Sequence, residues 1–115
     1  MSSDTIGPLE HIREAAGYIA ADTAGMDFEA FEADRRTRQL VERNFEIIGE
    51  AMHRLRRHAP ELVDRISTSH EIVGFRNHLA HGYDKIDQST VWRAVQEKLP
   101  ILRDEVDALL REIET

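Results

Sequence analysis

Apolar residues in the first part of the chain recur every three or four positions, which is the spacing of one face of an α-helix. The first set follows Pro8, a residue suited to an opening helical turn; its members are Leu9, Ile12, Ala16 and Ile19. We therefore expect a helix over residues 8–22, preceded by a frayed arm at residues 1–6 and closed by Gly25.

The longest helix is predicted from Asp34, which suits an N-cap, to about His58. Its apolar residues form two adjoining stripes: Val41, Phe45, Ile48, Met52 and Leu55 in one, and Leu40, Ile47 and Ala51 in the other. A helix that packs only against its own domain needs a single stripe. The pattern leaves two explanations open, a central position in a bundle and burial at a dimer interface.

A further helix is expected to begin near Ser69, because Thr68 and Glu71 have the spacing of a capping box. Gly82 suits the position just past its last turn. The apolar residues of this segment have i, i+3, i+7 spacing and should face a core; they are Ile72, Phe75 and Leu79.

Asp27 and Asp87 are expected to cap two more helical segments. Apolar residues after Asp87 continue at close to seven-residue spacing to the C-terminus, with Pro100 expected to break or kink the run. No segment alternates apolar with polar residues, and no Asn-Gly or Asp-Gly hairpin turn is present. The sequence predicts an all-α fold, an up-and-down bundle of four to five helices in a single domain over residues 1–115.

Composition narrows the class of protein. The chain has 115 residues, of which 41% are hydrophobic and 32% charged, as in a globular domain rather than a disordered chain. Apolar runs are only a few residues long, so no membrane span is expected. The absence of cysteine excludes disulfides and thiolate chemistry, and is compatible with a cytoplasmic location. A net charge of −7 argues against non-specific coating of nucleic acid.

The charge is unevenly distributed. Residues 35–58 contain seven Arg against three Glu. Arginine suits bidentate phosphate contacts, so this stretch is compatible with a phosphate-binding surface. It is equally compatible with a solvated helix face holding i, i+4 ion pairs such as Glu50–Arg54.

The candidate chemistry lies within residues 74–83, where five polar side chains are able to hold a phosphate or move a proton: Arg76, Asn77, His78, His81 and Tyr83. Histidine, with a reference pKa of about 6.5, suits activation of a hydroxyl near neutral pH. Arginine suits neutralisation of a phosphorane. Asn77 can orient the imidazole or bind the phosphate. Together these residues are adequate for metal-independent cleavage of RNA, in which the 2′-hydroxyl attacks the phosphate.

Geometry limits this interpretation. Arg76 and His81 are five residues apart, so on a straight helix they point about 140° from one another. Both reach one ligand only in a groove or against a second subunit. The alternative is a purely structural role for both residues, in which His81 caps the helix end and Arg76 pairs with Glu46 or Glu50. His78 and His81 could share a metal ion, but no third ligand is identifiable, so no metal or cofactor is predicted.

One motif matches the Arg-X-X-X-X-His-X-Tyr signature of the HEPN superfamily. Four residues separate Arg76 from His81, and one residue separates His81 from Tyr83. More narrowly, the chain resembles the HepT-like toxins of bacterial and archaeal toxin–antitoxin modules. The similarity covers nearly the whole chain and includes residues 34–37, 43–51 and 72–77 and the pair Val91-Trp92.

This resemblance implies a helical-bundle homodimer with a cleft that gathers Arg76 and His81 from both subunits. It implies a metal-independent endoribonuclease in which Asn77 assists. It also implies a partner, a minimal nucleotidyltransferase antitoxin that transfers AMP from ATP onto Tyr83. The added charge and bulk would compete with the RNA phosphate.

Two other functions remain compatible with the residues. One is a non-catalytic HEPN module that presents a nucleotide or substrate to a nucleotidyltransferase and does not cut RNA. The other is a purely structural dimerisation bundle, in which the helix that carries Arg76 only packs.

Overall fold

The computed structural model describes residues 3–80 and 87–114, without the side chains of His78 and Ala80. No β-strand occurs in these ranges. The helical elements are α1 (Ser3–Thr23), α2 (Phe28–Ala33), α3 (Arg35–His58), α4 (Pro60–Val63), α5 (Ser69–Ala80), α6 (Gln88–Arg93), the π-helical turn η1 (Ala94–Lys98) and α7 (Leu99–Glu114). The predicted all-α bundle is confirmed.

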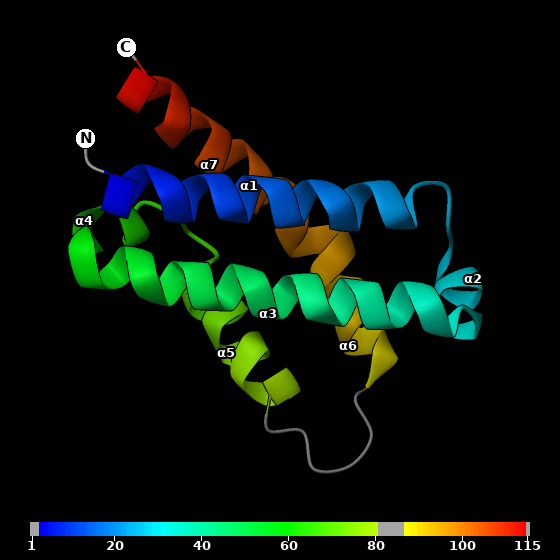
Figure 1. The fold of residues 1–115 in the computed structure, drawn as a ribbon. Helices are drawn as coiled ribbons and strands as arrows, with labels where there is room; N and C mark the ends of the chain where they lie inside the picture. Colours follow the sequence, from blue (N-terminus) through cyan, green and yellow to red (C-terminus); the bar gives the residue numbers. More distant parts are fainter. Residues whose placement is uncertain (1–2, 81–86, 115) are drawn as a thin grey trace.

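Helix α3 is the central element of the fold. It lies alongside α1 over most of its length, and α5 packs against another side of it (Figure 1). Helix α7 packs against α1, and the short α2 connects α1 to α3 next to α6. No helix in the described part of the chain is both long enough and apolar enough to cross a membrane.

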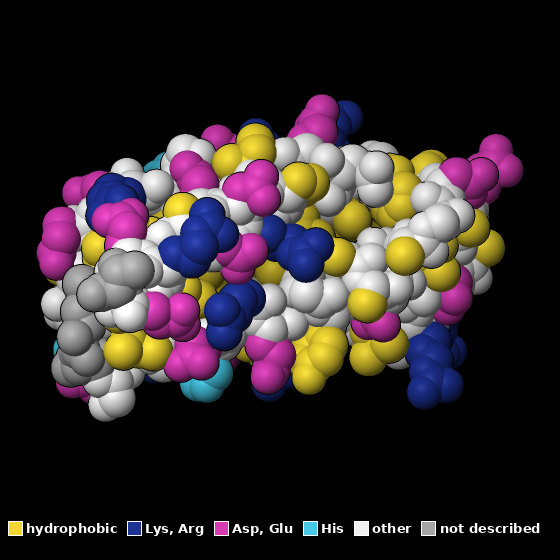
Figure 2. Space-filling model, turned by 90° about the horizontal axis from the view of Figure 1, so that it is seen from above, with side chains coloured by type: hydrophobic (Ala, Val, Ile, Leu, Met, Phe, Trp, Pro, Cys, Tyr) yellow, Lys and Arg dark blue, Asp and Glu magenta, His cyan; other side chains and the backbone are white. Residues whose placement is uncertain are grey.

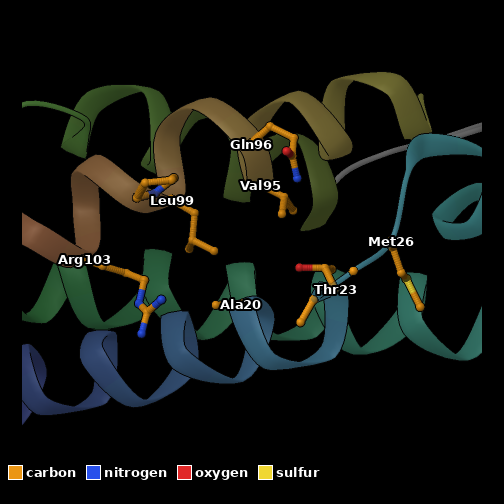
Figure 3. Close-up of a pocket in the computed structure, with 10 residues that line it drawn as sticks. Ala20, Thr23, Met26, Val95, Gln96, Leu99 and Arg103 are labelled. Atoms are coloured by element: carbon orange, nitrogen blue, oxygen red, sulfur yellow. The ribbon is translucent and has the colours of Figure 1, made fainter.

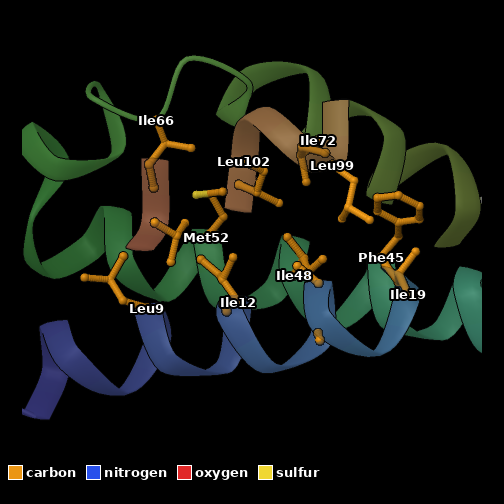
Figure 4. Packing of buried hydrophobic residues seen from close by; sticks show 14 of the residues in the cluster. Leu9, Ile12, Ile19, Phe45, Ile48, Met52, Ile66, Ile72, Leu99 and Leu102 are labelled. Atoms are coloured by element: carbon orange, nitrogen blue, oxygen red, sulfur yellow. The ribbon is translucent and has the colours of Figure 1, made fainter. Parts of the chain in front are cut away.

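The hydrophobic core lies between the α1–α3 pair and the layer formed by α5 and α7 (Figure 4). From α3 it receives Phe45, Ile48 and Met52, all fully buried. Helix α1 supplies the row predicted from its spacing, and every member of that row is buried. Since α3 packs against both α1 and α5, its position dictates where α5 and its polar residues lie.

Three aspartates cap helices as predicted. The carboxylate of Asp27 accepts a hydrogen bond from the backbone N–H of Ala30 at 2.8 Å. Asp34 accepts one from the N–H of Thr37 at 3.1 Å, and this bond lowers the pKa of Asp34 below its ordinary value. Asp87 accepts from the N–H of Ser89 at 3.0 Å. Each cap supplies an acceptor for an N–H group that the first helical turn leaves unpaired.

The prediction that residues 1–6 form a frayed arm is wrong for the described part of that segment, because α1 begins at Ser3. Pro8 therefore lies inside the helix rather than at its start. It removes a single hydrogen bond, the one to the carbonyl of Asp4. Thr5, Pro8 and Leu9 are buried, and this packing offsets the loss. Gly25 follows the end of α1 with a φ of 77°, a conformation that favours glycine.

Helix α5 begins at Ser69 as predicted, but the capping box does not form. The buried hydroxyl of Thr68 has no hydrogen-bond partner among the described residues. The carboxylate of Glu71 instead pairs with Nζ of Lys98 in η1 at 2.6 Å. A tertiary ion pair thus replaces the local pairing that the spacing predicted, and connects α5 to the C-terminal helices.

Pro100 interrupts the backbone hydrogen bonding without breaking the helical path. The π-turn η1 ends two residues before it, and the N–H of Leu99 donates to the carbonyl of Ala94, five residues earlier. Pro100 then lies in the first turn of α7, where its missing N–H costs little. The expected break is therefore a change of helix type.

The second apolar stripe of α3 is largely explained within one chain. Ala51 is fully buried, and Ile47 is half-buried and packs against the core. Leu40, at 43% exposed, remains open to solvent. The central position of α3 accounts for two of the three residues.

Candidate active site

Arg76 is placed by the packing of α5 on α3. On α5, Ile72 and Leu79 are buried, and the ring of Phe75 meets that of Phe45 edge-on with 5.0 Å between centroids. These contacts hold the segment before Arg76 firmly against α3. Gly74 and Asn77 lie on the exposed side of the helix, as the apolar spacing predicted.

The guanidinium of Arg76 is held by two neighbouring side chains. Nη2 lies 3.5 Å from Oε1 of Glu50 on α3, which is one of the two partners the sequence suggested. Nη1 donates to Oδ1 of Asn77 at 3.2 Å. Nε is buried and has no acceptor among the described residues. The side chain is 24% exposed, so its terminal nitrogens reach the surface while its stem does not.

The stem of Arg76 lies directly on Gly49 of α3. A β-carbon placed on Gly49 would overlap the β- and γ-carbons of Arg76 and lie 3.1 Å from its δ-carbon. Only glycine allows the two helices to approach this closely here. The sequence interpretation missed Gly49, although an isolated glycine inside a helical pattern is a recognised sign of close packing.

The remaining predicted site residues are placed only in part. Asn77 is exposed and adjacent to the guanidinium, as expected for a residue that assists Arg76. His81 and Tyr83 lie outside the described residues, as does Gly82, the expected helix end. The predicted divergence of Arg76 and His81 therefore stays a prediction.

Metal ligation has no support in the described part of the chain. Within residues 3–80 and 87–114, no three His, Asp or Glu side chains cluster in a way that could hold a metal ion. His81 and the side chain of His78, the pair that the sequence suggests, lie outside the described residues.

The arginine-rich stretch has both paired and exposed members. The i, i+4 pair between Glu50 and Arg54, the example of a solvated helix face, does not form: Glu50 contacts Arg76, and Arg54 contacts Nδ1 of His11 at 2.9 Å. Arg43 pairs with Glu46 one turn away at 3.5 Å. Other arginines of the stretch are exposed and form no ion pair with another described residue, among them Arg35, Arg36, Arg56 and Arg57. Part of the positive charge of α3 thus stays available to an anionic partner.

Other surfaces offer less to such a partner. On the face formed by α1 and α7, cationic and anionic side chains are interspersed (Figure 2). A hollow of about 320 Å³ lies between the end of α1 and the segment formed by η1 and α7 (Figure 3). Thr23, Met26 and Arg103 help to line it, and none of the predicted site residues does. The candidate chemistry therefore stays with α5 and α3.

Comparison with known proteins identifies the family. The model of the family described as "Ribonuclease HepT-like" matches residues 9–109, which include α3 and α5. The chain belongs to the HepT-like ribonuclease family. It is a member of the HEPN superfamily, as its sequence motif predicted.

Curated members of the HepT-like family align with almost the whole chain. A protein of Thermococcus cleftensis named "Probable ribonuclease HepT" is 34% identical over 105 residues, which is 88% of this chain and 91% of the relative. A Methanocaldococcus jannaschii protein, named as a candidate RNase, is 33% identical over 86% of this chain and 90% of the relative. No solved structure matches the chain.

Proposed function

We propose that this protein is a metal-independent endoribonuclease. The observation that carries the proposal is that Arg76, part of the family signature, is held between α3 and Asn77 with its terminal nitrogens at the surface. The names of the HepT-like relatives support RNA as the substrate. Among the functions considered, cleavage of RNA makes the fullest use of this arrangement.

The proposed reaction is a transesterification. His81 takes the proton of a ribose 2′-hydroxyl, whose oxygen attacks the adjacent phosphorus. The bond from phosphorus to the 5′-oxygen breaks, and that oxygen receives a proton, leaving a 2′,3′-cyclic phosphate and a 5′-hydroxyl. Arg76 neutralises the charge on the phosphorane, and Asn77 orients the Arg76 guanidinium. Because the arginine supplies the positive charge, the step requires no divalent cation.

We further propose that the enzyme is the toxin of a toxin–antitoxin pair and acts as a homodimer. A shared cleft would bring Arg76 and His81 together from two subunits despite their divergence on one helix. A minimal nucleotidyltransferase would inhibit the toxin by transferring AMP from ATP to Tyr83, two residues after His81. The phosphate of AMP would add negative charge beside the guanidinium that has to bind RNA.

The decisive experiment measures RNA cleavage by purified protein in EDTA. We expect the wild type to cut and Arg76→Ala and His81→Ala to lose about 100-fold or more in rate, since each removes a group acting in the transition state. Matched controls are Arg13→Ala, from an exposed pair with Glu10, and His70→Ala, from the exposed start of α5. Both should cut at the wild-type rate.

Mass spectrometry of peptides that contain Tyr83 must accompany the assay, because protein already carrying AMP would be inactive. Product ends give an independent check, since transesterification leaves cyclic phosphates. Loss of cleavage in chelator would contradict a metal-independent mechanism. Failure of unmodified wild type to cut a broad set of RNAs would favour the non-catalytic module instead.

A further inference from the structure

Arg76 is partly exposed, and among the described residues its side chain contacts Gly49 and Glu50 of α3 and Asn77 of its own helix. We propose that Gly49 and Glu50 are positioning residues for Arg76: Gly49 provides the surface on which the arginine stem lies, and Glu50 sets the direction of the guanidinium. We call Gly49, Glu50 and Asn77 the Arg76 cradle. The inference rests on the proposed ribonuclease function and names the residues that make Arg76 effective in it.

The first argument is steric. Any side chain at position 49 would occupy the volume of the Arg76 β- and γ-carbons, so Arg76 or the whole of α5 would have to move. Other helical glycines of this fold would leave room for a side chain. A β-carbon on Gly17 of α1 or on Gly74 of α5 would meet no atom within 4 Å. The requirement for glycine therefore belongs to the place where Arg76 crosses α3.

The second argument concerns the donors of the guanidinium. Glu50 pairs with Nη2 and Asn77 accepts a hydrogen bond from Nη1, so each terminal nitrogen has one protein partner. Each of these nitrogens carries two N–H groups, which leaves one on each for a ligand. Two donors on neighbouring nitrogens match two oxygens of a phosphate. The cradle thus orients the guanidinium while it leaves a donor on each terminal nitrogen for a ligand.

The third argument is that the arrangement is a poor choice for stability alone. Nε is buried without an acceptor among the described residues, which is unfavourable for folding. The Glu50 side chain is 45% exposed, and ion pairs with such exposure contribute little to folding. An arginine held at this cost, with its terminal nitrogens outward, is better explained by presentation to a ligand than by support of the core.

The test compares steady-state cleavage by Gly49→Ala and Glu50→Gln with matched controls. Gly17→Ala introduces the same methyl group into a helix where there is room for it. Glu46→Gln removes the same charge one turn away, from a pair with Arg43 of the same length, 3.5 Å. Because Glu46→Gln also relieves repulsion of RNA, it separates orientation of Arg76 from a change in net charge.

We expect Gly49→Ala to lower kcat by about 100-fold, the scale on which misplacement of a catalytic group acts. Glu50→Gln should lower kcat by about tenfold, with KM changed by less than about threefold, because orientation acts in the transition state. Gly17→Ala and Glu46→Gln should stay within about twofold of the wild type. The result that overturns the proposal is Glu50→Gln cutting as fast as, or faster than, Glu46→Gln. That would make Glu50 a competitor of the RNA phosphate. Wild-type kcat in a folded Gly49→Ala protein would equally overturn it.

A spectroscopic measurement separates this proposal from the proposed function. In nitrogen-15 spectra of the arginine side chains, the buried Nε–H group of Arg76 should give a signal that exchanges slowly with solvent. This signal is assigned to Arg76 because it should be absent in Arg76→Lys. We expect Gly49→Ala to lose the slow exchange, Glu50→Gln to shift the signal, and both controls to retain it unchanged. If the wild type cuts no RNA, the proposed function fails, but the Nε–H signal still tests whether Gly49 and Glu50 position Arg76. If Gly49→Ala does not fold, Glu50→Gln decides it, and an unchanged signal in Glu50→Gln overturns it.

Discussion

At the scale of single residues, individual carboxylates determine how the helices begin and where Arg76 is held. Asp27, Asp34 and Asp87 cap helices as expected, because a cap involves only the next few residues. Glu50 was assigned two possible partners and takes Arg76, which is 26 positions away in sequence. The role of Gly49 depends on which helix crosses it, and no local pattern contains that information.

Glu42 is the residue whose protonation should be visible in stability. Burial raises its pKa above the ordinary value, while Arg38 opposes the shift and Glu46 adds to it. The folded protein therefore holds this proton to higher pH than the unfolded chain does. The unfavourable effect of the charge is present above the folded pKa, and disappears as pH falls through it toward the unfolded value.

We expect Glu42→Gln to be more stable than the wild type at pH 7, with the difference shrinking toward zero by about pH 3, where the carboxyl is neutral in both states. Urea unfolding at several pH values measures this. Asp34→Ala is the opposite-sign comparison, because a backbone hydrogen bond from Thr37 lowers the pKa of Asp34. It should be less stable than the wild type at pH 7, and its deficit should shrink as pH falls through the folded pKa of Asp34. A Glu42→Gln effect that does not change with pH would contradict the assignment to burial.

At the scale of elements, periodicity located the helices, and tertiary contacts decided their ends and their type. Burial of Thr5 and Pro8 extends α1 to Ser3, past the proline that was expected to begin it. Glu71 turns to Lys98 in place of the capping box, because the ion pair directs its carboxylate toward the C-terminal helices. From the sequence, Pro100 predicts only an interruption of the helix. The structure shows that the chain stays helical there by forming a π-turn before the proline.

The docking of α5 on α3 depends on the pair of Phe45 and Phe75. Phe45 is fully buried and its ring meets Phe75 edge-on. We expect Phe45→Ala to reduce the free energy of unfolding by about 3–5 kcal/mol, the usual range for loss of a buried ring. Hydrogen exchange should quicken in α5 more than in α1, because α5 loses its aromatic contact.

Urea unfolding and amide exchange measure both effects. Ile101→Ala, from a side chain 45% exposed on α7, is the control and should change stability by no more than about 0.5 kcal/mol. If Phe45→Ala cost no more than this control, α5 would be held by something other than the ring pair, and the placement of Arg76 would need another explanation.

At the scale of the whole molecule, the fold class followed from the pattern, and the family followed from the motif and the segments around it. Helical spacing and the absence of strand alternation are properties of the chain itself, so a helical bundle could be predicted. The second apolar stripe on α3 could not be interpreted without coordinates, and most of it is now explained by contacts inside one chain. Assembly is a different matter, because it depends on surfaces that meet only in a second copy.

The proposed homodimer makes activity depend on concentration. If Arg76 and His81 act together only across two subunits, an isolated chain has no complete site. Cleavage per protein molecule should then fall on dilution once the dimer dissociates, whereas a monomeric enzyme would keep a constant specific activity. Light scattering should give twice the chain mass of 13.2 kDa where activity is full, and approach the single mass where it is lost. Full specific activity in a preparation with the single mass would rule out a shared cleft, and Arg76 and His81 would then have to meet on one chain.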